Sequence, residues 1–191
     1  MKKILILNAN PAKGSFCEAI AKRYYDEAIS AGHEARIVHI GEVDFNPSLY
    51  GGYKFETPIE DSLKEQQQNI LWCEHLVIAT PNWWSGVPAV FKGFIDRVFL
   101  PHFAFAYKPN GMVEGLLKGR SARVFITQDS PKFWSRCIVG DPLWKMLKKG
   151  TLSFCGIKPV NRTIFCIVRK SDDKQREKWL DETAKLAKKG E

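Results

Sequence analysis

The 191-residue chain lacks the features that mark secreted proteins, membrane proteins and disulfide or zinc scaffolds. Its first apolar run, Ile4 to Leu7, is four residues long, too short for the apolar region of a signal peptide. No other run reaches the length of a transmembrane helix. The five cysteines are odd in number and never in CxxC spacing, which argues against a disulfide framework and a zinc site. We therefore expect a cytoplasmic protein with buried thiols and no membrane insertion.

Common motifs for phosphate, dinucleotide and hydrolytic sites are missing as well. The chain contains no GxxxxGK[ST], no GxGxxG and no GxSxG, so neither a nucleotide fingerprint nor an α/β-hydrolase nucleophile is present. The histidines show no metal-ligand spacing; they are His33, His39, His75 and His102. We expect no metal site.

What the chain does have is a large apolar fraction and a positive charge. With 45% apolar residues, residues 1–191 are expected to form one domain with its own core. The formal charge of +8 suits nucleic acid, an acidic membrane surface or a phosphorylated small molecule. Much of it lies in residues 145–150 and in the C-terminal tail, whose alternating charges predict a solvated helix face. No basic stripe is interleaved with aromatic residues, so nucleic acid is not expected as a partner.

Short apolar runs alternate with helical patterns along the chain. The predicted strands are Lys3 to Asn8, Glu34 to Ile40, His75 to Thr80, Ala122 to Thr127 and Val160 to Val168. Five helices are predicted. The first begins at Ser15, and the third covers Ala89 to Phe99, with Pro88 at its first-turn position. The other three cover Leu63 to Cys73, Leu143 to Phe154 and Asp172 to Lys188. This pattern predicts an α/β fold, a doubly wound five-stranded parallel sheet of order 2-1-3-4-5 with helices on both faces. Two long loops, Gly41 to Pro58 and Pro101 to Arg120, are expected to shape a pocket or a partner face.

Three loops are expected to meet at the carboxyl edge of this sheet. Residues 8–16 and 80–86 follow strands 1 and 3, on either side of the point where the strand order reverses, and residues 127–131 follow strand 4. Amides around Ser15 at a helix N-terminus suit a phosphate, although a plain N-cap also explains them. Trp83 or Trp84 would form an apolar platform for a flat conjugated ring, or else one packs in the core and the other at a subunit contact. Cys17 reads as a structural thiol.

Four segments together resemble a known family. "NANPAKGSFCEAI", "PNWWSGVPAVFKGFIDRV", "TQDSP" and "TLSFCGIKPV" are similar to the flavodoxin-like NAD(P)H:quinone oxidoreductases, the DT-diaphorase family, especially its short bacterial members. The resemblance implies a bound flavin, FMN or FAD, and a homodimer with two sites at the interface. It also implies ping-pong reduction of quinones or similar acceptors by NADH or NADPH.

The same resemblance implies the residues that bind the flavin. Ser15 and Phe16, with the adjacent Cys17, match the phosphate loop, and Asn10 stands where a histidine is common. The implied ring-binding residues are Pro81, Asn82, Trp83, Trp84 and Ser85, and the implied loop after the fourth strand is Thr127, Gln128, Asp129 and Ser130.

One part of the family pattern is absent. The tyrosine and histidine that assist hydride transfer in the larger enzymes align with Phe133 and Val139. The one candidate catalytic side chain is then His102, for which loop packing is the favoured interpretation. A non-enzymatic role is the alternative function: a flavodoxin-type electron carrier or a regulatory subunit of a transporter. The basic charge and the aromatic loop from Pro101 favour the enzyme.

Overall fold

Five parallel strands form the central sheet, in the order β2-β1-β3-β6-β7. The computed structural model describes residues 1–52 and 57–191. The strands are β1 (Lys3–Asn8), β2 (Glu34–His39), β3 (His75–Pro81), β6 (Ser121–Gln128) and β7 (Val160–Cys166). Counted along this sheet, the order is 2-1-3-4-5, which confirms the prediction, and β1 begins and ends at the predicted residues.

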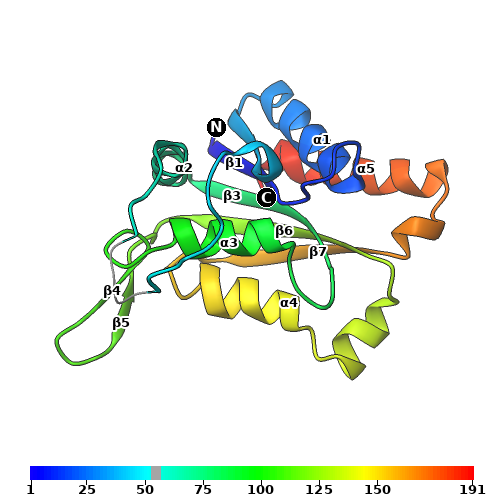
Figure 1. The fold of residues 1–191 in the computed structure, drawn as a ribbon. Coiled ribbons are helices and arrows are strands. Elements are labelled where there is room, and N and C mark those ends of the chain that lie inside the picture. The colour runs from blue at the N-terminus through cyan, green and yellow to red at the C-terminus, as the bar shows by residue number, and fades with distance from the viewer. Residues whose placement is uncertain (53–56) are drawn as a thin grey trace.

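Helices cover both faces of the sheet (Figure 1). One layer contains α1 (Phe16–Ser30) and α5 (Asp173–Lys189); the other contains α3 (Ala89–Val98) and the short α4 (Pro142–Lys145), with α2 (Asp61–Trp72) packed beside α3. The side chains of alternate residues of β1 pack against the two helix layers. Ile4 and Ile6 belong to the core under α1, whereas Leu5 and Leu7 belong to the core under α3. A strand buried on both faces is the arrangement that its continuous apolar run predicts.

Side-chain caps define where the two outer helices begin. The hydroxyl of Ser15 accepts a hydrogen bond from the amide of Glu18 at 3.3 Å, so Ser15 is the N-cap of α1, as predicted. The Asp172 carboxylate caps α5 in the same way, accepting from the amide of Gln175 at 2.7 Å. Pro88 precedes α3 as its N-cap and does not lie in the first turn, where the sequence placed it.

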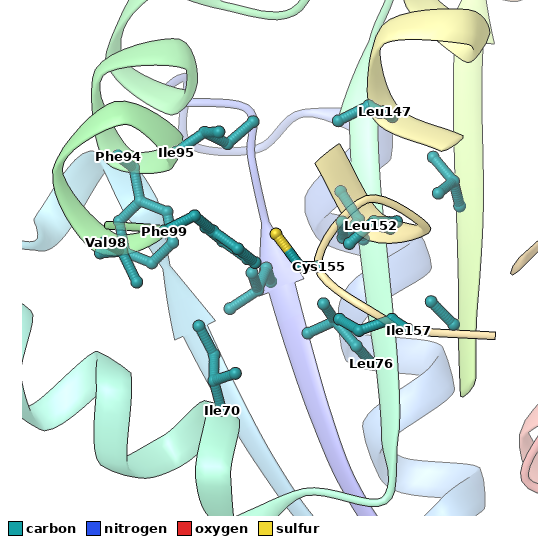
Figure 2. Close-up of a cluster of buried hydrophobic side chains, with 14 of the residues drawn as sticks. Ile70, Leu76, Phe94, Ile95, Val98, Phe99, Leu147, Leu152, Cys155 and Ile157 are labelled. Carbon is teal, nitrogen blue, oxygen red and sulfur yellow. The ribbon is translucent and has the colours of Figure 1, made fainter. Parts of the chain in front are cut away.

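The larger core lies between the sheet and the layer that contains α3. Figure 2 shows Ile95 from α3 and Phe99, the residue that follows α3, in one apolar cluster with Leu152 and Cys155, which follow α4 in the chain. All four side chains are less than a tenth exposed. Since burial of one large apolar side chain stabilises a fold by about 1.5 to 3 kcal/mol, this cluster holds α3 and the chain after α4 on the sheet.

The loop from Pro101 to Arg120 contains structure that the sequence did not predict. β4 (Phe105–Tyr107) and β5 (Val113–Gly115) pair as an antiparallel hairpin. A Cβ atom on Gly115 would lie 2.4 Å from the carbonyl carbon of Cys155, so the hairpin packs directly against the backbone there. The loop from Gly41 begins within a short 3₁₀ helix, η1 (Ile40–Glu42), and its residues 53–56 lie outside the described residues.

The C-terminal half departs from the predicted elements at three places. The helix predicted over Leu143 to Phe154 is α-helical only to Lys145 and continues as a π-helix, η3 (Met146–Leu152). A second π-helix, η2 (Trp134–Ile138), follows β6. β7 ends at Cys166 and not at Val168, because Ile167 has a left-handed backbone (φ 60°) and leads into the 3₁₀ helix η4 (Val168–Lys170). π-helical turns are rare and often lie at functional sites.

The cysteines are not all buried, which corrects the sequence-based expectation. Cys17, Cys73 and Cys155 are buried and Cys166 is partly buried, but Cys137 on η2 is exposed. Burial raises the pKa of the Cys17 thiol to about 11. Within residues 1–52 and 57–191, no helix is long and apolar enough to cross a bilayer, and no three His, Cys, Asp or Glu side chains are grouped as metal ligands.

Candidate functional site

Strands β1, β3 and β6 bring the three predicted loops to one edge of the sheet. The amide of Ala9 donates to the carbonyl of Ala79 at 2.9 Å, and the amide of Asn82 donates to the carbonyl of Thr127 at 2.8 Å. Across these strands, the Cys17 thiol and the Thr127 hydroxyl are hydrogen-bonded at 3.2 Å. The start of α1 is thereby tied to the end of β6, and the loops converge as the sequence predicts.

The loop after β3 ends in a tight turn with an unusual composition. Trp83 and Gly86 exchange two backbone hydrogen bonds, both 2.9 Å long, around the central residues Trp84 and Ser85. Both central residues have positive φ, 52° and 62°, which is the geometry of a type I′ turn. Such positions favour glycine, asparagine or aspartate, and each left-handed residue of another type costs roughly 1 kcal/mol. The turn presents Trp84 wholly to the surface and leaves Trp83 about half exposed.

A chain of amide and hydroxyl groups lies behind this turn. Asn82 Nδ2 donates to Gln128 Oε1 at 3.1 Å. Gln128 Nε2 in turn donates to the carbonyl of Ser130 at 3.0 Å and to the hydroxyl of Ser135 at 2.5 Å. These bonds orient the Asn82 amide so that its Oδ1 is buried, and this oxygen has no hydrogen-bond partner among the described residues. An unsatisfied buried acceptor is uncommon, and Asn82, the residue that carries it, lines a cavity.

We call this cavity the edge cavity. It has a volume of about 300 Å³ and lies between the Trp84 turn, the loop after β6 and the start of α4. Its walls are Asn82, Trp84, Ser85, Gln128, Asp129, Ser130, Trp134, Ser135, Val139, Asp141, Pro142 and Leu143. Six of these were predicted from the sequence as site residues: Asn82, Trp84, Ser85, Gln128, Asp129 and Ser130. Exposed aromatic rings beside buried polar groups suit a flat ligand with one polar edge.

The N-terminus of α1 offers free amides beside a second hollow. Phe16 and Cys17 are the first residues of the helix, so their amides have no acceptor within it. The hollow, about 360 Å³, is lined by Gly14, Ser15, Phe16, Ala19, Asp173, Arg176, Glu177 and Leu180. The carboxylate of Glu18 accepts a hydrogen bond from the amide of Gly14 at 2.6 Å, so an anion already occupies part of this N-terminus.

Other predicted residues serve the shape of the site through their packing. The Phe16 ring packs on Phe165 and Trp179, with centroid distances of 6.1 and 5.7 Å. Pro81 is buried, and Thr127 is occupied by its bond to the Cys17 thiol. Asn10 accepts from the amide of Ala12 at 3.0 Å and lines a crevice of about 10 Å³, so it shapes the loop after β1.

The family assignment follows from comparison of the whole chain. The model of a family described as having a flavodoxin-like fold matches residues 2–188. The chain belongs to this flavodoxin-like family. A Haemophilus influenzae protein named "Uncharacterized NAD(P)H oxidoreductase" is 32% identical to it over 183 residues, 93% of this chain and 90% of that protein. The crystal structure of Smu.1420 from Streptococcus mutans is 33% identical, has a TM-score of 0.84, and matches 98% of this chain and 99% of that one.

A more distant relative carries a more specific name. The "FMN-dependent NADH:quinone oxidoreductase" of Metamycoplasma arthritidis is 25% identical over 141 residues, 70% of this chain and 72% of that protein. The family assignment confirms the resemblance drawn from the four sequence segments. The described strand order is the one expected of a flavodoxin-like chain.

Several features of this flavodoxin-like chain could not be found from sequence spacing. Trp134, Ser135 and Asp141 line the edge cavity but lie in or after η2, a π-helix with no distinct sequence signal. Val139, which the resemblance aligns with the histidine of the larger enzymes, is in the same wall, whereas Phe133 is exposed outside it. His102 lies elsewhere: it is exposed in the turn before β4, with φ 67°, and does not line the edge cavity of its own chain.

Proposed function

We propose that the chain is a flavin-dependent NAD(P)H oxidoreductase that passes two electrons, by ping-pong hydride transfer, to quinones or similar acceptors. One observation carries the proposal: an exposed tryptophan held at positive φ lines the same cavity as Asn82, whose buried Oδ1 has no hydrogen-bond partner among the described residues. Nothing in the folding of the chain requires either feature, so both point to a ligand. The names of its relatives, which include NAD(P)H, FMN and quinone, agree with this reading.

The residues of the edge cavity fit the ring of a flavin. Trp84 would offer its indole face, while Asn82 Oδ1 and the backbone from Asn82 to Ser85 would meet the polar edge of the ring. The amides of Asp129 and Ser130, which follow β6, would face the polar edge of the ring and stabilise negative charge there. A bound flavin supplies the two-electron chemistry, because no protein side chain reversibly accepts a hydride.

The amides at the start of α1 would hold the flavin phosphate. Ser15, Phe16 and Cys17 present the positive end of the helix dipole to the hollow between α1 and α5. Arg176 lies in the wall of the same hollow as a cation, together with the acidic side chains of Asp173 and Glu177. In this arrangement Cys17 acts through its amide, because its buried thiol has a raised pKa and stays protonated at neutral pH.

The protein's own contribution to the chemistry is orientation and exclusion of water. The chain from Asn82 through Gln128 to Ser135 locks the polar wall of the cavity, and Trp134 and Leu143 form an apolar wall. The carboxylate of Asp129 is held in place beside this cavity, because it accepts a hydrogen bond from the amide of Arg169 at 2.7 Å.

We further propose that the protein is a cytoplasmic single-domain homodimer. An apolar groove of about 500 Å³ lies at the β4–β5 hairpin and is lined by Phe99, Phe105, Tyr107 and Phe154 among others. More than half of the surface of Tyr107 is exposed in the single chain. Burial of this aromatic surface against a second copy of the chain would be favourable. Light scattering on the purified protein tests this: a mass near 21.8 kDa would mean a monomer, and twice that mass a dimer.

The function is tested by the colour, content and turnover of the purified protein. We expect a yellow protein whose released flavin is identified by mass, and whose steady-state oxidation of NADPH depends on menadione. Protein that retains no flavin, and takes up neither FMN nor FAD after unfolding and refolding, would contradict the proposal. Flavin that binds but is not reduced by NADH or NADPH would instead support the electron-carrier alternative.

A further inference from the structure

A second cavity beside the edge cavity is lined by four cationic side chains. We call it the basic pocket; it has a volume of about 270 Å³ and is formed by Arg136, Gly140, Asp141, Trp144, Lys145, Lys148 and Lys149. Asp141 lines both cavities. Arg136 directly follows Ser135, which lines the edge cavity. The two cavities therefore share a wall, and one extended ligand can occupy both.

The positive charge of the basic pocket is not neutralised. Within the described part of the chain, no carboxylate lies within salt-bridge distance of Arg136, Lys145, Lys148 or Lys149. The one acid in the wall, Asp141, is paired with Arg162 at 2.5 Å, and both side chains are less than a fifth exposed. Lysines elsewhere, such as Lys22 and Lys92, have acidic partners at 2.8 and 2.7 Å. A gathering of unpaired cations in one concavity favours an anionic ligand.

Two of the four cations lie against defined parts of the pocket, Lys148 at the Trp144 ring and Lys145 at the turn before α4. Lys148 Nζ lies 5.2 Å from the centroid of the Trp144 ring, and the Arg162 guanidinium lies 4.8 Å from it. Gly140 and Asp141 both have left-handed backbones, with φ 82° and 61°, which turn the chain from η2 into α4. A Cβ on Gly140 would come within 3.7 Å of Lys145 Nζ, so the ammonium group lies directly over this turn.

We propose that the basic pocket binds the 2′-phosphate of NADPH, and that it makes this chain prefer NADPH to NADH. The inference rests on the proposed function, because it assumes that the nicotinamide ring stacks on a flavin ring held at the edge cavity. A phosphate monoester carries close to two negative charges at pH 7. Several lysine and arginine side chains around one phosphate are a strong arrangement for binding such a group. NADH and NADPH share a pyrophosphate with two negative charges, which two cations would balance. The four unpaired cations of the basic pocket leave two positive charges for the additional phosphate of NADPH.

The test compares the two donors on the flavin-containing protein. In the double variant Lys148→Ala/Lys149→Ala, we expect the KM for NADPH to rise roughly tenfold, since two charged contacts to the phosphate are lost and solvent exposure weakens each of them. The KM for NADH should change less than twofold. Lys185→Ala removes the same charge from α5, in the opposite layer, and should alter neither constant. An equal rise for both donors, or no rise for either, would overturn the proposal.

A binding experiment separates this inference from the proposed function. Calorimetric titration with adenosine 2′,5′-bisphosphate and with adenosine 5′-monophosphate measures the affinity of the basic pocket for each nucleotide. The measurement requires no electron transfer. We expect the bisphosphate to bind at least tenfold more tightly, and this advantage to disappear in the double variant. Equal binding of the two nucleotides, or binding of inorganic phosphate as tight as that of the bisphosphate, would show a non-selective anion site and refute the inference. If the protein fails to oxidise either donor, the proposed function fails, and the titration still decides what the basic pocket binds.

Discussion

Replacement of Trp84 by alanine should separate folding from flavin binding. Trp84 is wholly exposed, so its side chain buries no apolar surface within the chain, and removal should leave no cavity. Alanine at φ 52° meets the same left-handed penalty as tryptophan, so the backbone cost is unchanged. The free energy of unfolding of the flavin-free protein should therefore stay within about 0.5 kcal/mol of the wild-type value.

Flavin binding should respond very differently. Loss of a stacking partner for a flat ring costs about 1 to 3 kcal/mol, which corresponds to roughly a 5- to 150-fold rise in the dissociation constant. Quenching of flavin fluorescence, measured as apoprotein is added, gives this constant. Thermal unfolding of the same apoprotein gives the stability. Tyr50→Ala is a matched control, because it removes an exposed aromatic ring from the loop before α2, which does not line the edge cavity.

Two results would refute this reasoning. An unchanged flavin dissociation constant in Trp84→Ala would place the ring somewhere other than beside this turn. A loss of apoprotein stability of 2 kcal/mol or more, on the scale of a buried side chain, would mean that the indole is a structural element of the fold.

Four further changes test other parts of the structure. Ser85→Gly should stabilise the apoprotein by about 1 kcal/mol in thermal unfolding, because glycine adopts φ 62° without strain. Glu18→Gln should tighten FMN binding roughly threefold by removing a negative charge from the α1 N-terminus, while riboflavin, which has no phosphate, should bind as before. Burial lowers the pKa of His75 to about 3, so between pH 6.5 and pH 3 the unfolded chain binds one proton more than the folded chain. The free energy of unfolding should therefore fall by up to about 1.4 kcal/mol for each pH unit of acidification in this range, and it should fall less in His75→Leu. The rate of flavin reduction, measured by stopped flow, should be nearly independent of pH from about 6 to 8 and unchanged in His102→Phe. A bend in the pH–rate profile of the wild type that disappears in His102→Phe would contradict this prediction.

The fold was largely predictable because its local signals agree with one another. The apolar run of β1 and the Ser15 cap each specify a boundary, and each boundary lies where the pattern placed it. Alternation of strands and helices then leaves few topologies, because parallel crossovers share one hand. Local agreement of this kind is strongest in the first half of the chain.

The features that were missed depend on tertiary contacts. Trp84 and Ser85 adopt positive φ although neither residue type favours it, so no propensity rule finds their turn. The β4–β5 hairpin has three-residue strands, and it is the close approach of Gly115 to Cys155 that places it. The π-helices differ from α-helices by one residue per turn, a difference that a hydrophobic pattern does not show. The polar wall of the edge cavity was predicted, whereas the wall from η2 was not.

The exposed thiol of Cys137 makes the region between the two cavities observable. Cys137 lies on η2, next to Arg136 of the basic pocket and two residues from Ser135 of the edge cavity. Burial raises the pKa of both Cys73 and Cys155 to about 12, so these thiols are protected from alkylation while the protein is folded. A maleimide fluorophore would therefore attach to the native protein at this position first, without any mutation. Such a reporter would register ligands arriving in either cavity in real time.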